Sequence, residues 1–172
     1  SAFGNAGQRC LAGSVAVGVG KVGDALVKEL AADAAKLKVG PGTDAKTTMG
    51  PVIRGERKAK LIEDIDGARS EGARMVSDGR QVDQSDGFFL GPTIFDQVTP
   101  NMKIWKAALF GPVLSVVRSS DLDAALTLLN STTYRHMAPS LTHSGKYVGA
   151  CKLPPQAGMP GAHTDTAQPS RV

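Results

Sequence analysis

Aromatic side chains are scarce in this sequence, at 5% of its 172 residues. A hydrophobic core must therefore be built mainly from aliphatic residues, and a hydrophobic content of 41% is enough for one domain. The formal net charge is only +4, and basic residues are scattered among acidic ones. Because no basic block is interleaved with aromatic residues, nucleic-acid binding is not expected, and the charges are better explained as solvated helix faces.

Cysteine and histidine are also rare. Cys10 and Cys151 are the only cysteines, which excludes a disulfide framework and leaves a single bridge between them open. The three histidines, His136, His143 and His163, lack the spacing of metal ligands on a helix. We therefore expect no metal site.

Long apolar runs are missing as well. No stretch approaches the ~20 residues of a membrane span, and no signal peptide is visible. The expected location is therefore cytoplasmic, without contact with a membrane. The sequence begins with Ser1 and not with Met, which indicates processing, tag removal or a fragment.

Apolar periodicity predicts strands that alternate with helices. The predicted strands cover residues 14–19, 74–77, 88–95 and 113–117. The predicted helices cover residues 24–37 and 54–70, and a third follows a Ser-x-x-Asp capping pattern that begins at Ser120. This alternation predicts an α/β fold of three layers, with a mostly parallel sheet flanked by helices.

The character of the sequence changes near its end. From residue 151 onward it carries Pro, Gly and polar residues with no period. We therefore predict one domain over residues 1–150 and an irregular or disordered tail over residues 151–172.

The glycines Gly18, Gly20 and Gly23 have the G-x-G-x-x-G spacing between a predicted strand and a predicted helix. This pattern is typical of dinucleotide sites when a second strand and an acidic residue follow about 20 positions later. Here Asp44 has roughly that offset, but it follows a Pro-Gly turn, and residues 38–39 are too short for the strand. The run is better interpreted as a glycine-rich corner between strand and helix.

The segment whose residues could take part in catalysis lies earlier in the chain. It reads FGNAGQRCLA over residues 3–12. Small, flexible residues deliver Cys10 next to Arg9, at the expected start of a helical turn. A positive neighbour and helix N-terminal amides favour the nucleophilic thiolate form of a cysteine. From spacing alone, a small buried core cysteine is the alternative.

This segment closely resembles the nucleophile segment of the aldehyde dehydrogenase superfamily. Its GQRC form resembles the CoA-acylating branch of methylmalonate-semialdehyde dehydrogenases. Further matches follow in the same order and extend to about Ser144: LKVG at 37–40, MGPVI at 49–53, EGA at 71–73, DGR at 78–80, GFFLGPTI at 87–94 and FGPVLSV at 110–116.

The resemblance implies a reaction and a site. In the family a cysteine thiolate attacks an aldehyde, a hydride passes to NAD, and the resulting thioester transfers its acyl group to CoA. Cys10 would be the nucleophile, and its backbone N–H would supply half of an oxyanion hole. Arg9 would hold the substrate carboxylate, with an exposed surface charge as the alternative. Phe110 would lie beside the nicotinamide ribose, with a core phenylalanine as the alternative.

The sequence also departs from the family pattern. Ala107 and Ala108 replace two glutamates, the second of which contacts the nicotinamide ribose in the family. The family's cofactor domain lies upstream of the nucleophile, and the likeness ends beyond Gly145. We therefore expect a fragment of the catalytic domain, inactive by itself, that associates with a second copy or a partner chain. The alternatives are a non-catalytic pseudoenzyme or interaction module with the same fold, or residual thiol chemistry without NAD.

Overall fold

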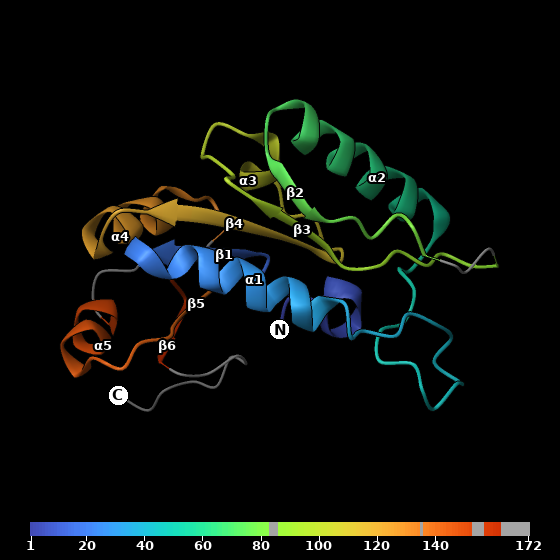
Figure 1. Cartoon of the computed structure of the whole chain (residues 1–172), viewed down its shortest axis with the longest axis horizontal. Coiled ribbons are helices and arrows are strands. Elements are labelled where there is room, and N and C mark those ends of the chain that lie inside the picture. The colour runs from blue at the N-terminus through green and yellow to red at the C-terminus, as the bar shows by residue number, and fades with distance from the viewer. Residues whose placement is uncertain (83–85, 135, 153–156, 163–172) are drawn as a thin grey trace.

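A four-stranded sheet forms the centre of the molecule. A computed structural model describes residues 1–82, 86–134, 136–152 and 157–162 (Figure 1). In the order of the sheet, the strands are β1 (Val15–Val19), β4 (Val113–Ser119), β3 (Thr93–Asp96) and β2 (Arg74–Ser77). β4 pairs in parallel with both β1 and β3, whereas β2 pairs antiparallel to β3. The prediction of a mostly parallel sheet is confirmed.

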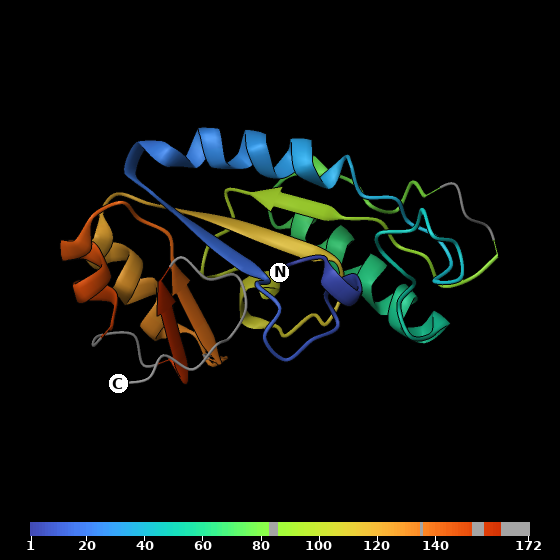
Figure 2. The ribbon, with the colours of Figure 1, turned by 90° about the horizontal axis from the view of Figure 1, so that it is seen from below.

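Helices cover both faces of this sheet. Helix α1 (Gly23–Ala34) lies on one face, and α2 (Gly55–Ser70) with the short α3 (Lys103–Lys106) lies on the other (Figures 1 and 2). The central strand β4 explains this arrangement, because nearly all of its side chains are buried and they alternate between the two faces.

Two clusters of buried side chains follow that alternation. Leu114 and Val116 of β4 belong to a cluster with Val27 of α1. Val113 and Val117 belong to a larger cluster that includes Leu61 and Ile65 of α2. The predicted three-layer α/β fold is therefore confirmed.

The remaining elements lie outside the four-stranded sheet and the three helices that cover it. They are the 3₁₀ turns η1 (Gly4–Gly7) and η2 (Gly20–Val22), helices α4 (Leu122–Ser131) and α5 (Gly145–Lys152), and strands β5 (Met137–Ser140) and β6 (Met159–Ala162). β5 and β6 form a separate parallel pair. The irregular tail expected over residues 151–172 is therefore wrong for residues 151–152, which belong to α5, and for the four residues of β6, whose backbone pairs with β5. Residues 153–156 and 163–172, including His163, lie outside the described residues, as does the side chain of Cys151. The domain boundary at residue 150 stays a prediction.

Three predicted boundaries shift. The strand expected at 88–95 begins only at Thr93, because Pro92 has no N–H and the Gly91 N–H donates to Gly79 O at 2.7 Å. The first helix ends at Ala34 instead of residue 37. The third helix is capped by Asp121, which accepts the Ala124 N–H at 2.8 Å, and not by Ser120.

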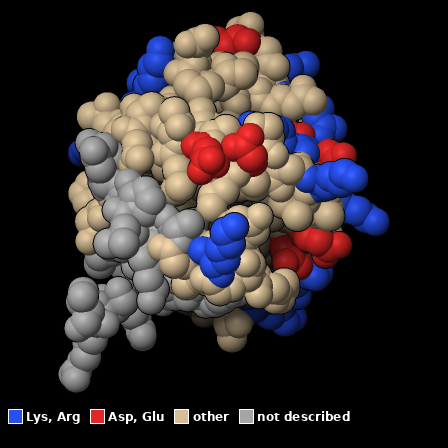
Figure 3. All heavy atoms as spheres, turned by 90° about the vertical axis from the view of Figure 1, so that its left-hand side faces the viewer, with Lys and Arg blue, Asp and Glu red and all other residues tan. Residues whose placement is uncertain are grey.

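Charged side chains are interspersed on the surface. On the face drawn in Figure 3, acidic side chains lie near the centre, basic and acidic side chains mix along the right-hand margin, and uncharged residues separate them. This arrangement agrees with the solvated charges expected from the sequence. Among the residues that the structure describes, no helix combines the length and apolarity that a membrane crossing requires.

A buried carboxylate at the end of β3 joins three strands and a helix. Asp96 has no exposed surface and accepts two hydrogen bonds from Arg118 of β4, each 2.8 Å long. It also accepts one from Arg74 of β2 at 2.6 Å and one from the Gln97 N–H at 2.8 Å. Arg118 in turn pairs with Asp24 of α1 at 3.0 Å. The arginines, Arg118 foremost, hold the pKa of Asp96 well below its usual range.

Replacing Asp96 by Asn is expected to lower the free energy of unfolding by about 2–3 kcal/mol, because Arg74 and Arg118 lose their buried counter-charge. The matched change Asp33→Asn removes an exposed pair with Lys36 and should leave that free energy nearly unchanged. Urea unfolding at neutral pH measures both. Equal effects of the two changes would contradict the central role of Asp96.

The same carboxylate predicts a sensitivity to acid. Since the pKa of Asp96 is lower in the folded chain, its contribution to stability is complete above the unfolded value of about 4. That contribution is lost as the pH falls from there toward the folded pKa. The free energy of unfolding should therefore fall more steeply below about pH 4 in the native chain than in Asp96→Asn, as measured by urea titrations at several pH values. Parallel slopes would disprove this linkage.

Candidate active site

The loop that precedes Cys10 has an unusual backbone. Asn5, Ala6 and Gly7 adopt positive φ angles of 53°, 52° and 69° in succession. This left-handed conformation is unfavourable for residues with a Cβ and persists only where surrounding contacts hold it. Ala6 is fully buried, and the Asn5 side-chain amide donates to Gln8 O at 3.1 Å. The loop is thus ordered by its contacts, although its sequence suggests flexibility.

Cys10 lies on the surface as a free thiol. It is part of a turn in which the Ala12 N–H donates to Arg9 O at 3.2 Å, and the next regular element is strand β1. The helical turn expected at Cys10 is therefore wrong, because the chain turns into a strand and supplies no helix N-terminus there. The exposure of Cys10 also argues against the alternative of a buried core cysteine.

Arg9, which precedes Cys10 in the chain, is exposed. Its guanidinium folds over Gly4, where an added Cβ would lie 3.4 Å from Arg9 Nη1. Among the described residues, no carboxylate lies within 4.0 Å of this guanidinium. The exposed guanidinium thus belongs to the residue that directly precedes Cys10, and an anionic group of a small molecule could reach it.

Phe110 is 47% exposed and also has a positive φ, of 44°. A core phenylalanine would be buried, so this alternative is wrong. The residue begins the turn that leads through Gly111 and Pro112 into β4. Gly111 is required there, because an added Cβ would lie 2.4 Å from Leu61 Cδ2 of α2.

The turns that carry Cys10 and Phe110 meet at one edge of the sheet. Cys10 precedes β1 and Phe110 precedes β4, and these two strands are parallel neighbours with Val15 opposite Ser115. The Ser115 N–H also donates to Ser14 O at 2.9 Å, so the pairing extends toward the two turns. Parallel pairing therefore places both turns at the amino ends of adjacent strands.

A direct backbone contact joins the two turns. Gly7 packs against Gly111 so closely that a Cβ on Gly7 would lie 2.1 Å from Gly111 O. The structure thus brings the three predicted site residues onto two turns in contact. It also adds a residue that the sequence reasoning missed, Gln8, whose Oε1 accepts the N–H of Ile53 at 3.0 Å. The motif contains Gln8, but nothing in the sequence indicates a partner 45 positions away.

The glycine run at 18–23 is a packed corner. An added Cβ on Gly23 would lie 2.0 Å from Arg118 Nη1, and one on Gly18 would lie 3.0 Å from the Gly23 Cα. The strand beside β1 is β4, not a strand that directly follows α1, so the β-α-β unit of a dinucleotide site is not formed. The interpretation of the run as a corner between strand and helix is confirmed.

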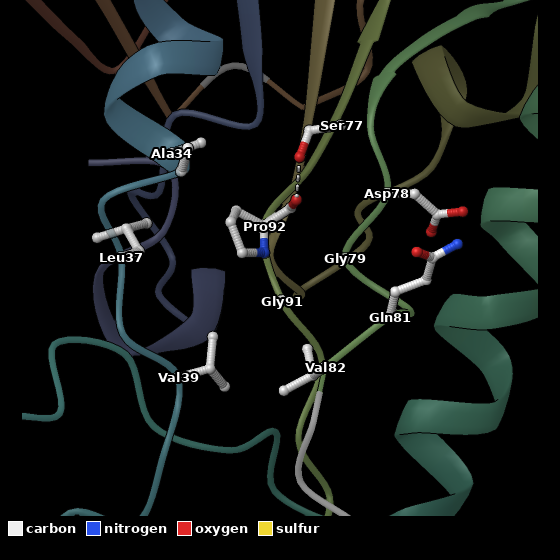
Figure 4. A pocket seen from close by; sticks show the side chains of 11 residues that line it. Ala34, Leu37, Val39, Ser77, Asp78, Gly79, Gln81, Val82, Gly91 and Pro92 are labelled. Atoms are coloured by element: carbon white, nitrogen blue, oxygen red, sulfur yellow. Dashed lines mark hydrogen bonds between the residues drawn. The ribbon is translucent and has the colours of Figure 1, made fainter.

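A groove lies elsewhere on the molecule. It has a volume of about 510 Å³ and separates the end of α1 from the connection between β2 and β3 (Figure 4). Leu37 and Val39 line one wall, and Val82 and Pro92 line the other. The hydroxyl of Ser77 donates to Pro92 O at 3.0 Å. None of the three predicted site residues lines this groove, and the part of the chain described here contains no cluster of potential metal ligands.

Comparison with known proteins identifies the family. The model of the family described as "Aldehyde dehydrogenase family" matches residues 1–169. The chain belongs to the aldehyde dehydrogenase family. The resemblance inferred from the segment around Cys10 is thus confirmed. The expectation that the likeness ends beyond Gly145 is wrong, because the match extends to residue 169.

Within the family, this aldehyde dehydrogenase chain is similar to malonate- and methylmalonate-semialdehyde dehydrogenases. "Malonate-semialdehyde dehydrogenase 2" of Geobacillus kaustophilus (strain HTA426) is 42% identical over 171 residues, which are 98% of this chain and 35% of that protein. The crystal structure of methylmalonate-semialdehyde dehydrogenase (DddC) from Oceanimonas doudoroffii superposes with a TM-score of 0.94 at 40% identity, over 98% of this chain and 35% of that one.

A third relative was solved with a cofactor. A Sinorhizobium meliloti 1021 protein, provisionally named methylmalonate-semialdehyde dehydrogenase, was crystallised as a complex with NAD. It superposes with a TM-score of 0.92 at 36% identity, over 99% of this chain and 35% of that one. The aldehyde dehydrogenase chain described here therefore spans about a third of the length of the relatives it matches.

The contact at Gly7 predicts that replacing Gly7 and Gly67 by alanine will have opposite effects on the free energy of unfolding. Gly7→Ala should lower the free energy of unfolding by at least about 2 kcal/mol, because it combines a positive φ with a clash against Gly111 O. Gly67→Ala, in open space on α2, should instead stabilise the chain by up to about 1 kcal/mol. Urea unfolding curves of the two variants test this, and a neutral Gly7→Ala would show that the turns are not in contact.

Proposed function

We propose that this chain supplies the nucleophile and the carboxylate-binding group of an acylating semialdehyde dehydrogenase that acts on malonate or methylmalonate semialdehyde. The observation that carries the proposal is the adjacency of Arg9 and Cys10, both exposed, on an ordered loop at the sheet edge. Support comes from the names of relatives that are 40–42% identical over 98% of the chain.

Cys10 is the nucleophile in this proposal. Its thiolate attacks the aldehyde carbon and forms a carbon–sulfur bond, while the carbonyl oxygen takes up the negative charge. The backbone N–H of Cys10 donates to that oxygen and forms half of an oxyanion hole. An exposed thiol on a fixed loop is suited to this step, because the aldehyde can approach while the sulfur keeps its place.

Arg9 selects the substrate. Malonate semialdehyde and methylmalonate semialdehyde both carry a carboxylate close to the aldehyde group. A guanidinium can pair with a carboxylate through two parallel hydrogen bonds, which orients the substrate as well as holding it. The neighbouring position of Arg9 would turn the aldehyde carbon toward the Cys10 sulfur.

The described residues fit NAD only in part. When bound, NAD supplies the acceptor for the hydride, and CoA then takes the acyl group from the cysteine. The exposed ring of Phe110 can contact the nicotinamide ribose. However, the Gly23 corner is filled by Arg118, and Ala107 and Ala108 offer methyl groups where the family has carboxylates. A pyrophosphate cradle would have to come from residues outside the described part.

Protection of Cys10 against alkylation tests the proposal without a cofactor. The reaction of Cys10 with iodoacetamide is measured in a Cys151→Ser background, in the presence of methylmalonate semialdehyde or of propanal. The concentration that halves the reaction rate should be about tenfold lower for methylmalonate semialdehyde, because only this aldehyde carries a carboxylate that pairs with Arg9. Arg9→Met should remove this difference, whereas the matched change Arg69→Met, at an exposed position of α2, should keep it. Equal protection by the two aldehydes in the native chain would refute the role of Arg9.

A non-catalytic module with the same fold is the second candidate, favoured by Ala107 and Ala108. Formation of NADH from NAD, CoA and methylmalonate semialdehyde by the purified chain would exclude the module, whereas its absence is expected of both candidates. We expect no NADH above the level of Cys10→Ser, since the glycine run of the described residues forms no pyrophosphate cradle. Turnover that disappears in Cys10→Ser and persists in Cys151→Ser would exclude the module and show that the chain holds its cofactor.

A further inference from the structure

The loop that carries Cys10 is attached to the core by packing and by one side-chain hydrogen bond. The Oε1 atom of Gln8, two residues before the thiol, accepts the N–H of Ile53 at 3.0 Å. The loop also packs on the core through Ala6, which belongs to the main buried cluster, and through Gly7, which lies against Gly111. Such packing opposes separation of the loop from the core but sets no direction as a hydrogen bond does. Gln8 therefore supplies the directional part of the contact between loop and core.

The backbone of Ile53, the hydrogen-bond partner of Gln8, is held in place by its neighbours in the chain. Val52, next to Ile53, is 1% exposed and its N–H donates to Phe88 O at 2.9 Å. On the other side, Arg54 is the residue from which helix α2 begins. The Ile53 N–H is thus held between a buried residue and a helix start, so it can serve as an anchor even though the Ile53 side chain is exposed.

The orientation of the Gln8 amide follows from its partners. The Ile53 N–H can only donate, so the oxygen of the amide must face it. The nitrogen then points to Asn5 O, which accepts from Gln8 Nε2 at 3.4 Å and from the Gln8 backbone N–H at 3.1 Å. One side chain therefore holds Ile53 on one side and the left-handed turn at Asn5 on the other.

Loss of the hydrogen bond between Gln8 and Ile53 would change the position of the Cys10 thiol. Asn5 and Ala6 have left-handed backbones that favour a return to ordinary angles once their restraints are lost. Such a change would turn the chain just before Cys10, which lies two residues beyond Gln8. We propose, resting on the assignment of Cys10 as nucleophile, that Gln8 is a positioning residue whose bond to Ile53 gives the Cys10 thiol a single presentation toward the aldehyde.

Three variants in the Cys151→Ser background test this role. Gln8→Met keeps the length of the side chain and removes the acceptor, Gln8→Glu keeps an acceptor oxygen, and Gln81→Met makes the same change at an exposed glutamine. Hydrogen exchange of the Ile53 amide should become at least tenfold faster in Gln8→Met and stay within about twofold of the parent in the other two. Unchanged exchange in Gln8→Met would show that the bond is absent and overturn the proposal.

The second readout is the rate of Cys10 alkylation by iodoacetamide at high pH, where the thiol is fully ionised. This limiting rate depends on the accessibility and orientation of the sulfur and not on its ionisation. It should change at least threefold in Gln8→Met and return to within about twofold of the parent in Gln8→Glu. Faster Ile53 exchange with an unchanged limiting rate would show that Gln8 is merely structural, which also overturns the proposal.

Failure of the proposed function would look different. If methylmalonate semialdehyde did not protect Cys10 even in the parent chain, the substrate assignment would fall, while the alkylation rates would still decide the role of Gln8. The melting temperature of each variant is measured first. Should Gln8→Met unfold under the assay conditions, Gln8→Ser, which stays polar but cannot reach Ile53, takes its place with the same expected results.

Discussion

The buried charge of Asp96 is the interaction on which the rest of the structure depends. A carboxylate with no exposed surface must be paired, and its partners come from β2 and β4. The pairing therefore fixes the edge strand β2 and the central strand β4 to β3 between them. Arg118 continues across Gly23 to Asp24 and holds the start of α1 against the sheet.

This network also explains the glycine run that resembles a nucleotide site. The guanidinium of Arg118 occupies the space that a Cβ on Gly23 would need. A glycine there permits the close passage of an arginine and not of a phosphate. The same spacing of glycines can therefore arise from an internal ion pair, and only the neighbouring strand distinguishes the two cases.

Much of the fold could be predicted from the sequence, because the apolar runs of β1, β4 and α2 satisfy local rules of burial. The candidate site could also be proposed in part from the sequence, since Cys10 and Arg9 stand in a distinctive motif and Phe110 in another. The contact of Gly7 with Gly111 and the bond from Gln8 to Ile53 could not be predicted. Both join segments far apart in the chain, and glycine or glutamine at such positions has no local signature. Asp121 was missed as a helix cap because a competing pattern begins one residue earlier, at Ser120.

The pairing of β1 with β4 has a consequence for the order of folding. Val15 lies opposite Ser115, so the pair closes a loop of 100 positions. Closing so long a loop carries a large entropic cost, and folds dominated by such pairings form slowly. The helices can form from local contacts, but the turns that carry Cys10 and Phe110 cannot meet until this pairing exists. The arrangement of the candidate site therefore depends on this long-range pairing, and a chain in which the pairing has not formed would present Cys10 without the turn of Phe110 at the neighbouring strand.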